Sequence, residues 1–271
     1  MRNFFVISLL LFFSNVILAQ DIKLSEKELM AQLDSIVKEG NLLYKYEKSA
    51  WISSDLANNV PIVQNNYGGY FTYETNSAIK TIILGKSHQN CIAEYTFTTN
   101  FDEPDFIFLN ERILYPFEKK LLEIREKIIK QLSNNKYDVR IPNGYSPNII
   151  LLPFKKGYKL YMIMGTSQSD VIPFGNDYLF VANEKGVIKN WHKFHSGIIF
   201  APTTYEGNKV TSLTHSHLRK TPLITATDIC TFMLYAPIYE IEEFSVYSPA
   251  LQIYMVYNIK SNKITIKEEQ E

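Results

Sequence analysis

The sequence predicts an α+β fold in which a mostly antiparallel sheet packs against helices. Three observations support this class. Short runs rich in β-branched and aromatic residues are separated by polar turns, which is typical of antiparallel meanders. Two longer segments carry apolar residues at helical spacing. Aromatic residues make up 14% of the 271 residues and apolar residues 46%, which indicates a folded protein rather than a disordered one.

The first 19 residues have the pattern of a cleaved secretory signal peptide. Arg2 provides a positive start, residues 4–13 are apolar except for Ser8, and a small residue, Ala19, ends the segment. The apolar run is short for a bilayer span, which needs about 20 apolar residues, although an uncleaved anchor is the alternative. We therefore predict an exported protein, periplasmic or secreted, with no membrane span after signal cleavage.

The chain has 28 basic and 28 acidic residues, so its formal net charge is zero. Such a chain has no electrostatic basis for binding nucleic acid or an anionic membrane, so neither partner is expected. Cys91 and Cys230 are the two cysteines. They could pair in an exported protein or remain buried free thiols, and their spacing does not decide between these alternatives.

The first predicted region covers residues 20–140. It begins with a helical segment up to residue 58, where Ser25 and Glu28 form a capping box and Gly40 is expected to interrupt the helix. A β-meander follows, and then a long amphipathic helix whose charged face is solvated. The expected strands are 67–73, 79–84 and 92–98, and the expected helix is 110–135.

The second predicted region covers residues 141–271. The polar segment 134–147, with Gly144 and two prolines, is the predicted boundary between the regions. After it, strand-like runs alternate with turns, and one further helix is expected over 225–235. The expected strands are 149–154, 158–164, 178–182, 187–191, 198–200, 209–217, 243–247 and 251–259, with a hairpin loop at 183–186.

The most informative motif is a pair of histidines followed by an aspartate. His215 and His217 lie at the end of a β-branched segment that reads as a strand, and Asp228 lies near the start of the next helix. Residues i and i+2 of a strand point to the same face, so the two imidazoles should lie side by side. Two imidazole nitrogens, one carboxylate oxygen and an open fourth position are typical of a catalytic zinc site.

The same residues resemble the zinc signature of the JAB/JAMM metallopeptidases. That signature is His-x-His, seven residues, serine, two residues and aspartate, and here Thr225 takes the position of the serine. The resemblance covers roughly residues 210–259 and implies a JAMM/cytidine-deaminase-like C-terminal half. It also implies one zinc ion per chain, held by His215, His217 and Asp228, and hydrolysis of a peptide or isopeptide bond by a metal-activated water. Thr225 would then position the water or stabilise the oxyanion.

The general base of that family, an upstream strand glutamate, has no direct counterpart. A related group of secreted JAB-like domains carries Glu-Tyr-Gly-Gly, whereas this chain has Asn66 before residues 67–69. Asparagine cannot take a proton at neutral pH, so Glu94 is the substitute candidate for the base, with Glu74 next. Leu218 also replaces the proline that usually follows the second histidine.

A structural interpretation of the motif stays open. Thr225 and Asp228 also fit a capping box, which would occupy the carboxylate with backbone N–H groups. His192 and His195 would face opposite sides of a strand and are not expected to share a metal; His195 is interpreted as a loop or edge residue, or as part of the cleft. The alternative function is a non-catalytic exported binding protein with a degenerate JAMM-like fold.

The chain also resembles a group of uncharacterised exported bacterial proteins. The shared stretches are like residues 93–97, 172–178 and 225–230. This resemblance implies export and no particular activity. Residues 173–178 are interpreted as a structural turn that enters a strand.

Overall fold

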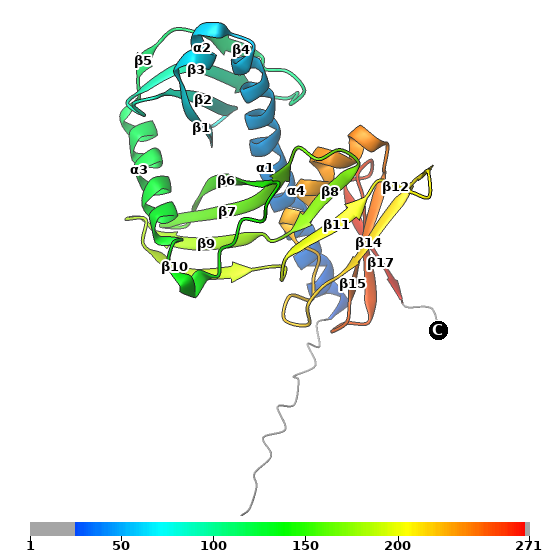
Figure 1. Cartoon of the computed structure of the whole chain (residues 1–271). Coiled ribbons are helices and arrows are strands. Elements are labelled where there is room, and N and C mark those ends of the chain that lie inside the picture. Colours follow the sequence, from blue (N-terminus) through cyan, green and yellow to red (C-terminus); the bar gives the residue numbers. More distant parts are fainter. Residues whose placement is uncertain (1–24, 269–271) are drawn as a thin grey trace, which may run out of the picture.

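A computed structural model describes residues 25–268 as helices packed against mostly antiparallel sheets, so the predicted α+β class is confirmed (Figure 1). The predicted signal peptide lies outside the described residues. Within residues 25–268, no helix is both long and apolar enough to cross a membrane.

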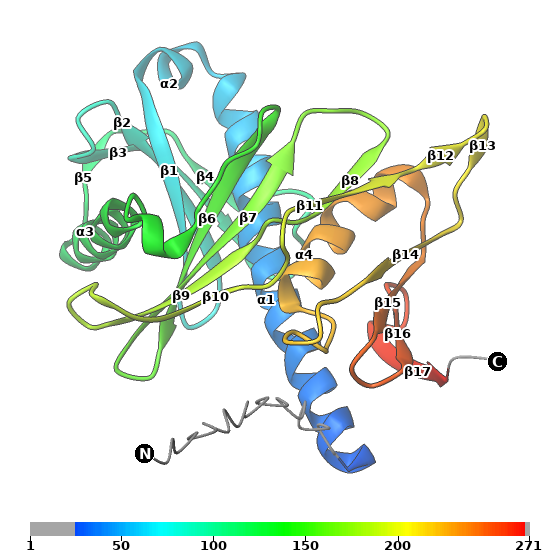
Figure 2. The ribbon, with the colours of Figure 1, turned by 60° about the horizontal axis from the view of Figure 1, so that its bottom comes forward.

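The first helix, α1 (Glu26–Asn58), extends along much of the molecule (Figure 2). It begins at the predicted capping box, because the Ser25 N–H donates to the Glu28 carboxylate at 3.0 Å and the Glu28 N–H donates to the Ser25 hydroxyl at 3.3 Å. Its buried face includes Leu33, Val37 and Leu43, which join the largest hydrophobic core.

The predicted interruption at Gly40 is wrong, because α1 continues through it. Gly40 instead lies where α1 packs closely against another helix, α4 (Ala226–Tyr235). A Cβ atom at this position would lie 2.7 Å from Cβ of Ile229 and 3.1 Å from the carbonyl oxygen of Ala226. The absence of a side chain therefore allows the two helices to pack.

Substitution of Gly40 tests this contact. Alanine normally stabilises a helix interior by about 1 kcal/mol relative to glycine. Here we expect Gly40→Ala to lower the free energy of unfolding by about 1–2 kcal/mol, because overpacking a core costs about 1–3 kcal/mol. Denaturant unfolding measures the change, with Ser35→Ala on an exposed part of the same helix as the control. Stabilisation by Gly40→Ala would contradict the close packing.

The first sheet and its flanking helices occupy residues 61–131. The strands follow the predicted meander, in the order β1-β2-β3-β4 with β5 also paired to β3. The predicted helix over 110–135 starts late, because residues 112–113 pair with β3 and Pro116 favours the first turn of a helix. The elements are α2 (Pro61–Asn66), β1 (Tyr67–Glu74), β2 (Ile79–Gly85), β3 (Asn90–Phe97), β4 (Phe106–Phe108), β5 (Arg112–Ile113) and α3 (Pro116–Gln131).

The second sheet has the order β10-β9-β7-β6 and is antiparallel throughout. Helix α3 covers it through Ile124 and Ile128, which pack in one core with Leu160 and Phe180. A hairpin loop joins β9 to β10, as predicted, and the Asn183 N–H donates to the Val187 carbonyl at 3.0 Å. The elements are η1 (Asn135–Tyr137), β6 (Tyr145–Phe154), β7 (Gly157–Thr166), β9 (Tyr178–Asn183) and β10 (Ile188–Lys193).

The C-terminal part contains two ribbons and a third sheet. The third sheet has the order β14-β15-β16-β17, and its β14–β15 pair is parallel, with α4 between these strands in the chain. The elements are β8 (Val171–Gly175), β11 (Ile198–Pro202), β12 (Thr204–Tyr205), β13 (Asn208–Lys209), β14 (Ser212–Ser216), η2 (Ala236–Tyr239), β15 (Glu243–Ser248), β16 (Ile253–Asn258) and β17 (Lys263–Glu268).

The hydrophobic core crosses the predicted boundary near residue 140. Leu33 and Leu43 of α1 pack in one cluster with Ile229 of α4 and Phe244 of β15. Residues from the two predicted regions therefore share a core. The cysteines, left open above, are both free and buried, with Cys91 in one apolar cluster and Cys230 in another.

Candidate metal centre

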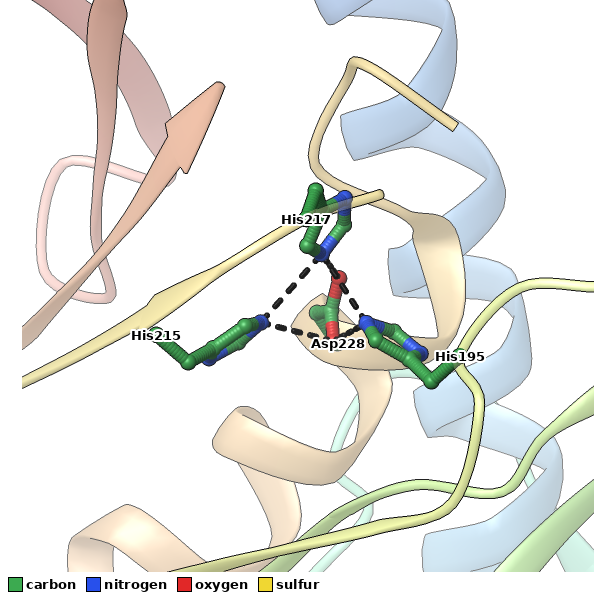
Figure 3. Close-up of side chains that lie close together, drawn as sticks. All are labelled: His195, His215, His217 and Asp228. Atoms are coloured by element: carbon green, nitrogen blue, oxygen red, sulfur yellow. Dashed lines mark hydrogen bonds and ion pairs between the residues drawn. The ribbon is translucent and has the colours of Figure 1, made fainter. Parts of the chain in front are cut away.

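The end of β14 presents two imidazoles to the interior. Side chains along this strand alternate between exposed and buried, so that His215 points inward and its neighbours Thr214 and Ser216 point outward. Pairing continues past the strand, because the His217 N–H donates to the Tyr247 carbonyl at 2.9 Å. His215 and His217 are both buried and point toward one another, as their spacing predicts (Figure 3).

The first turn of α4 supplies a buried carboxylate. The Thr225 hydroxyl accepts the Asp228 N–H at 3.1 Å, and Asp228 Oδ2 accepts the Thr225 N–H at 2.9 Å and the Thr225 hydroxyl at 2.6 Å. The predicted capping box is therefore present. It uses Oδ2, whereas Oδ1 faces the histidines and lies 3.5 Å from Nε2 of both His195 and His215.

A third imidazole, that of His195, comes from the segment after β10. Its Nδ1 lies 2.7 Å from Oδ1 of Asp177, a buried residue just before β9. The other oxygen of Asp177 accepts a hydrogen bond from the Thr227 hydroxyl in α4. These contacts orient His195 so that its Nε2 faces the other two histidines (Figure 3).

The facing atoms of the four side chains are spaced as the ligands of one ion. Nε2 of His217 lies 2.9 Å from Nε2 of His195, 3.2 Å from Nε2 of His215 and 3.2 Å from Oδ2 of Asp228. Ligand atoms of a tetrahedral zinc ion, each about 2.0–2.1 Å from the metal, are about 3.3 Å apart. His195, His215, His217 and Asp228 could therefore hold a metal ion together.

The hydrogen-bond partners of the imidazoles leave lone pairs at the centre. Nδ1 of His217 lies 2.7 Å from the Leu223 carbonyl oxygen and 3.2 Å from that of Thr221. Because a carbonyl can only accept, Nδ1 carries the proton and Nε2 of the neutral ring presents its lone pair. Asp177 imposes the same tautomer on neutral His195. Metal-binding histidines commonly have such acceptors on their outer nitrogen.

The carboxylates make this point attractive to positive charge. Burial lowers the pKa of His195, but Asp177 and Asp228 outweigh burial and raise the pKa to about 9. Burial raises the pKa of Asp228, but His195, His215 and His217 hold it well below its usual range. Burial lowers the pKa of His215, which favours its neutral, metal-binding form. A proton or a metal cation would each satisfy this arrangement.

One oxygen of the Asp228 carboxylate is placed to bind a cation. Asp228 Oδ1 is fully buried and has no hydrogen-bond partner, although a buried carboxylate oxygen without one is costly. It faces the imidazole nitrogens. Three imidazoles and a carboxylate form a borderline-soft ligand set that suits zinc and similar transition metals better than calcium or magnesium.

The structure does not bring the expected base, Glu94, to this centre. Glu94 lies on β3 in the first sheet, where Lys80 and Arg112 donate to its carboxylate, the latter at 2.6 Å. Arg112 also bonds the buried Glu118, so Glu94 belongs to an ion-pair network of that sheet. Strand β3 lies apart from β14 in both views (Figures 1 and 2). Glu74, the next candidate for the base, ends β1 of the same sheet.

Two other predicted residues have local structural roles. Asn66 ends α2, and its side-chain amide donates to the Ile62 carbonyl at 2.8 Å. Thr225 lies beside the centre, but its hydroxyl donates to Asp228 in the capping box. A hydroxyl engaged in this way is not free to bind an oxyanion.

Sequence reasoning did not place His195 in this group of side chains or pair it with Asp177. Their proximity follows from the β9–β10 hairpin, in which Tyr178 pairs with Lys193 and the Phe194 N–H donates to the Asp177 carbonyl at 3.1 Å. Counting back from the predicted loop at 183–186 would place Asp177 opposite His192. The observed pairing of Ala182 with Ile188 and the register shift between Ile188 and Asn190 move the partner by two residues, to Phe194, next to His195. This shift is not visible in the spacing of the sequence.

Comparison of the chain with protein-family models, with curated proteins and with solved structures found no match. What the four side chains can do follows from their own chemistry.

Proposed function

We propose that the protein binds one zinc ion through His195, His215, His217 and Asp228 and uses the ion to connect three parts of the fold. The observation that carries the proposal is the convergence of three imidazole nitrogens on the buried Asp228 carboxylate, whose Oδ1 accepts no hydrogen bond. Four protein ligands without an open position are typical of a structural zinc site.

The four proposed ligands come from segments that are distant in the chain, which the ion would connect. They come from β14 and its extension, from the first turn of α4, and from the segment after β10. When bound, zinc would supply positive charge that compensates Asp228 and would tie these segments together. The protein's own contribution is orientation, since Asp177 and the Leu223 carbonyl hold the imidazoles of His195 and His217.

Zinc-dependent hydrolysis of a peptide or isopeptide bond is the second candidate. It is supported by His215, His217 and Asp228 in a strand–loop–helix order followed by a parallel strand, as a JAMM-like C-terminal half implies. This mechanism needs an open fourth position and a base. His195 stands at the fourth position and Glu94 is paired elsewhere. The non-catalytic alternative, an exported protein with a degenerate site, is therefore better supported.

Metal analysis of untagged protein tests the proposal. We expect about one zinc per chain in the wild type and none in His217→Ala, because the substitution removes the nitrogen closest to two other ligands. His192→Ala is the matched control, since His192 contacts Thr221 and lies outside the ligand group. Equal zinc in wild type and His217→Ala would contradict the site.

The same assay separates the two candidates. If His195 is a ligand, His195→Ala should weaken zinc binding, whereas a three-ligand hydrolytic site would keep its zinc. Cleavage of fluorogenic peptides by the wild type, lost in His217→Ala and retained in His192→Ala, would favour hydrolysis.

A further inference from the structure

A cavity of about 410 Å³ lies beside the metal centre. Its walls come from α1, from β7, β9 and β10, and from residues 220–226. These elements meet next to α4 in Figure 2. The volume falls in the range of small-molecule sites, which is about 300–1,000 Å³.

Most of the cavity wall is apolar. Ile36 of α1, Leu179 of β9 and Phe194 line it, and all three are partly buried against the main core. Side chains from three different segments thus form one apolar surface that the fold holds in place. Such a surface is suited to a hydrocarbon chain or a ring.

The charges that line the cavity sum to a positive excess. Lys159 and Glu39 form an ion pair with each other. Lys220 is exposed and forms no ion pair with any of residues 25–268, so it is the one lysine of the wall without an acidic partner there. His192, the remaining basic group of the wall, has a pKa lowered by burial and by Lys220 and is neutral at pH 7.

We propose that this cavity binds a small amphipathic anion whose apolar chain contacts Ile36, Leu179 and Phe194 and whose carboxylate pairs with Lys220. The apolar walls and the single uncompensated ammonium group match the two ends of such a ligand. This inference goes beyond the proposed zinc site, because none of the four metal ligands lines the cavity.

The cavity nevertheless borders the metal centre through a shared loop. Thr221 and Leu223 line the cavity, and their carbonyl oxygens face Nδ1 of His217. The N-cap residue Thr225 also lines the cavity and holds Asp228. An occupant would therefore rest on the loop that orients two of the metal ligands.

Calorimetric titration with octanoate, and with octanol as the uncharged match, tests the proposal on the full-length mature protein. We expect octanoate to bind the wild type and to bind Lys220→Gln about tenfold more weakly. Its affinity for Arg219→Gln should equal that for the wild type, because Arg219 is a neighbouring charge that does not line the cavity. Octanol should bind the wild type and Lys220→Gln equally.

Ile36→Trp fills the cavity from the helix side and should abolish binding of both probes while zinc content and the unfolding midpoint stay near wild type. No binding of octanoate to the wild type, or equal affinity for wild type and Lys220→Gln, would overturn the proposal. Because zinc content is measured separately, failure of the cavity proposal is distinguishable from failure of the metal site.

Discussion

Removal of the proposed zinc ion with a chelator is expected to lower the thermal unfolding midpoint by about 10 °C. A ligand that binds only the folded state at 1,000 times its dissociation constant stabilises that state by about 4 kcal/mol. For a chain of about 250 residues, each kcal/mol shifts the midpoint by about 2–4 °C. Without the proposed cation, the buried Asp228 Oδ1 and the imidazole nitrogens that face it would lack a common partner.

Differential scanning calorimetry with and without chelator measures this shift, and added zinc should restore the original midpoint. His215→Ala provides the matched control, because its midpoint should already be low and should not respond to the chelator. A wild-type midpoint that is the same with zinc bound and with zinc removed would show that the ion does not stabilise the fold.

The second large effect concerns pH and the buried Glu47 of α1. Glu47 is only 6% exposed, and burial raises its pKa to about 8, with Arg125 offsetting a small part. The folded state therefore retains a proton that the unfolded chain, with an ordinary glutamate pKa near 4.5, releases. Stability should fall as the pH rises from about 4.5 to 8, because ionisation favours the unfolded chain there.

Glu47→Gln keeps the shape and removes this ionisation. Each pH unit of the window corresponds to about 1.4 kcal/mol, so the variant should be several kcal/mol more stable than the wild type at pH 8 and about equal at pH 4.5. Denaturant unfolding at the two pH values measures the difference, with the exposed Glu123→Gln as control. A difference that does not change with pH would contradict a raised pKa at Glu47.

The local elements of the fold were predictable because their signals are local. The capping boxes at Ser25 and Thr225 and the strand spacing of His215 and His217 depend on neighbours within a few residues. The late start of α3 was not predicted, since the apolar spacing of residues 110–115 resembles a helix and their pairing with β3 is a distant contact.

The candidate site was predictable only in part. Pattern and spacing identified His215, His217 and Asp228, whose side chains the structure brings together. Glu94 was proposed as the base from its strand and its chemistry, but neighbouring cations in the sheet occupy it. An ion-pair partner contributed by another strand is not visible in the spacing of one segment.

The sequence by itself determined the α+β class, the helix caps and the side of the strand on which two histidines lie, because these depend on backbone periodicity and on nearest neighbours. Tertiary structure alone decided that α1 shares a core with α4 and that Asp177 directs His195 to the same point. The physical reason is that a metal centre requires ligand atoms about 3.3 Å apart. Only the packing of segments distant in the chain sets that spacing.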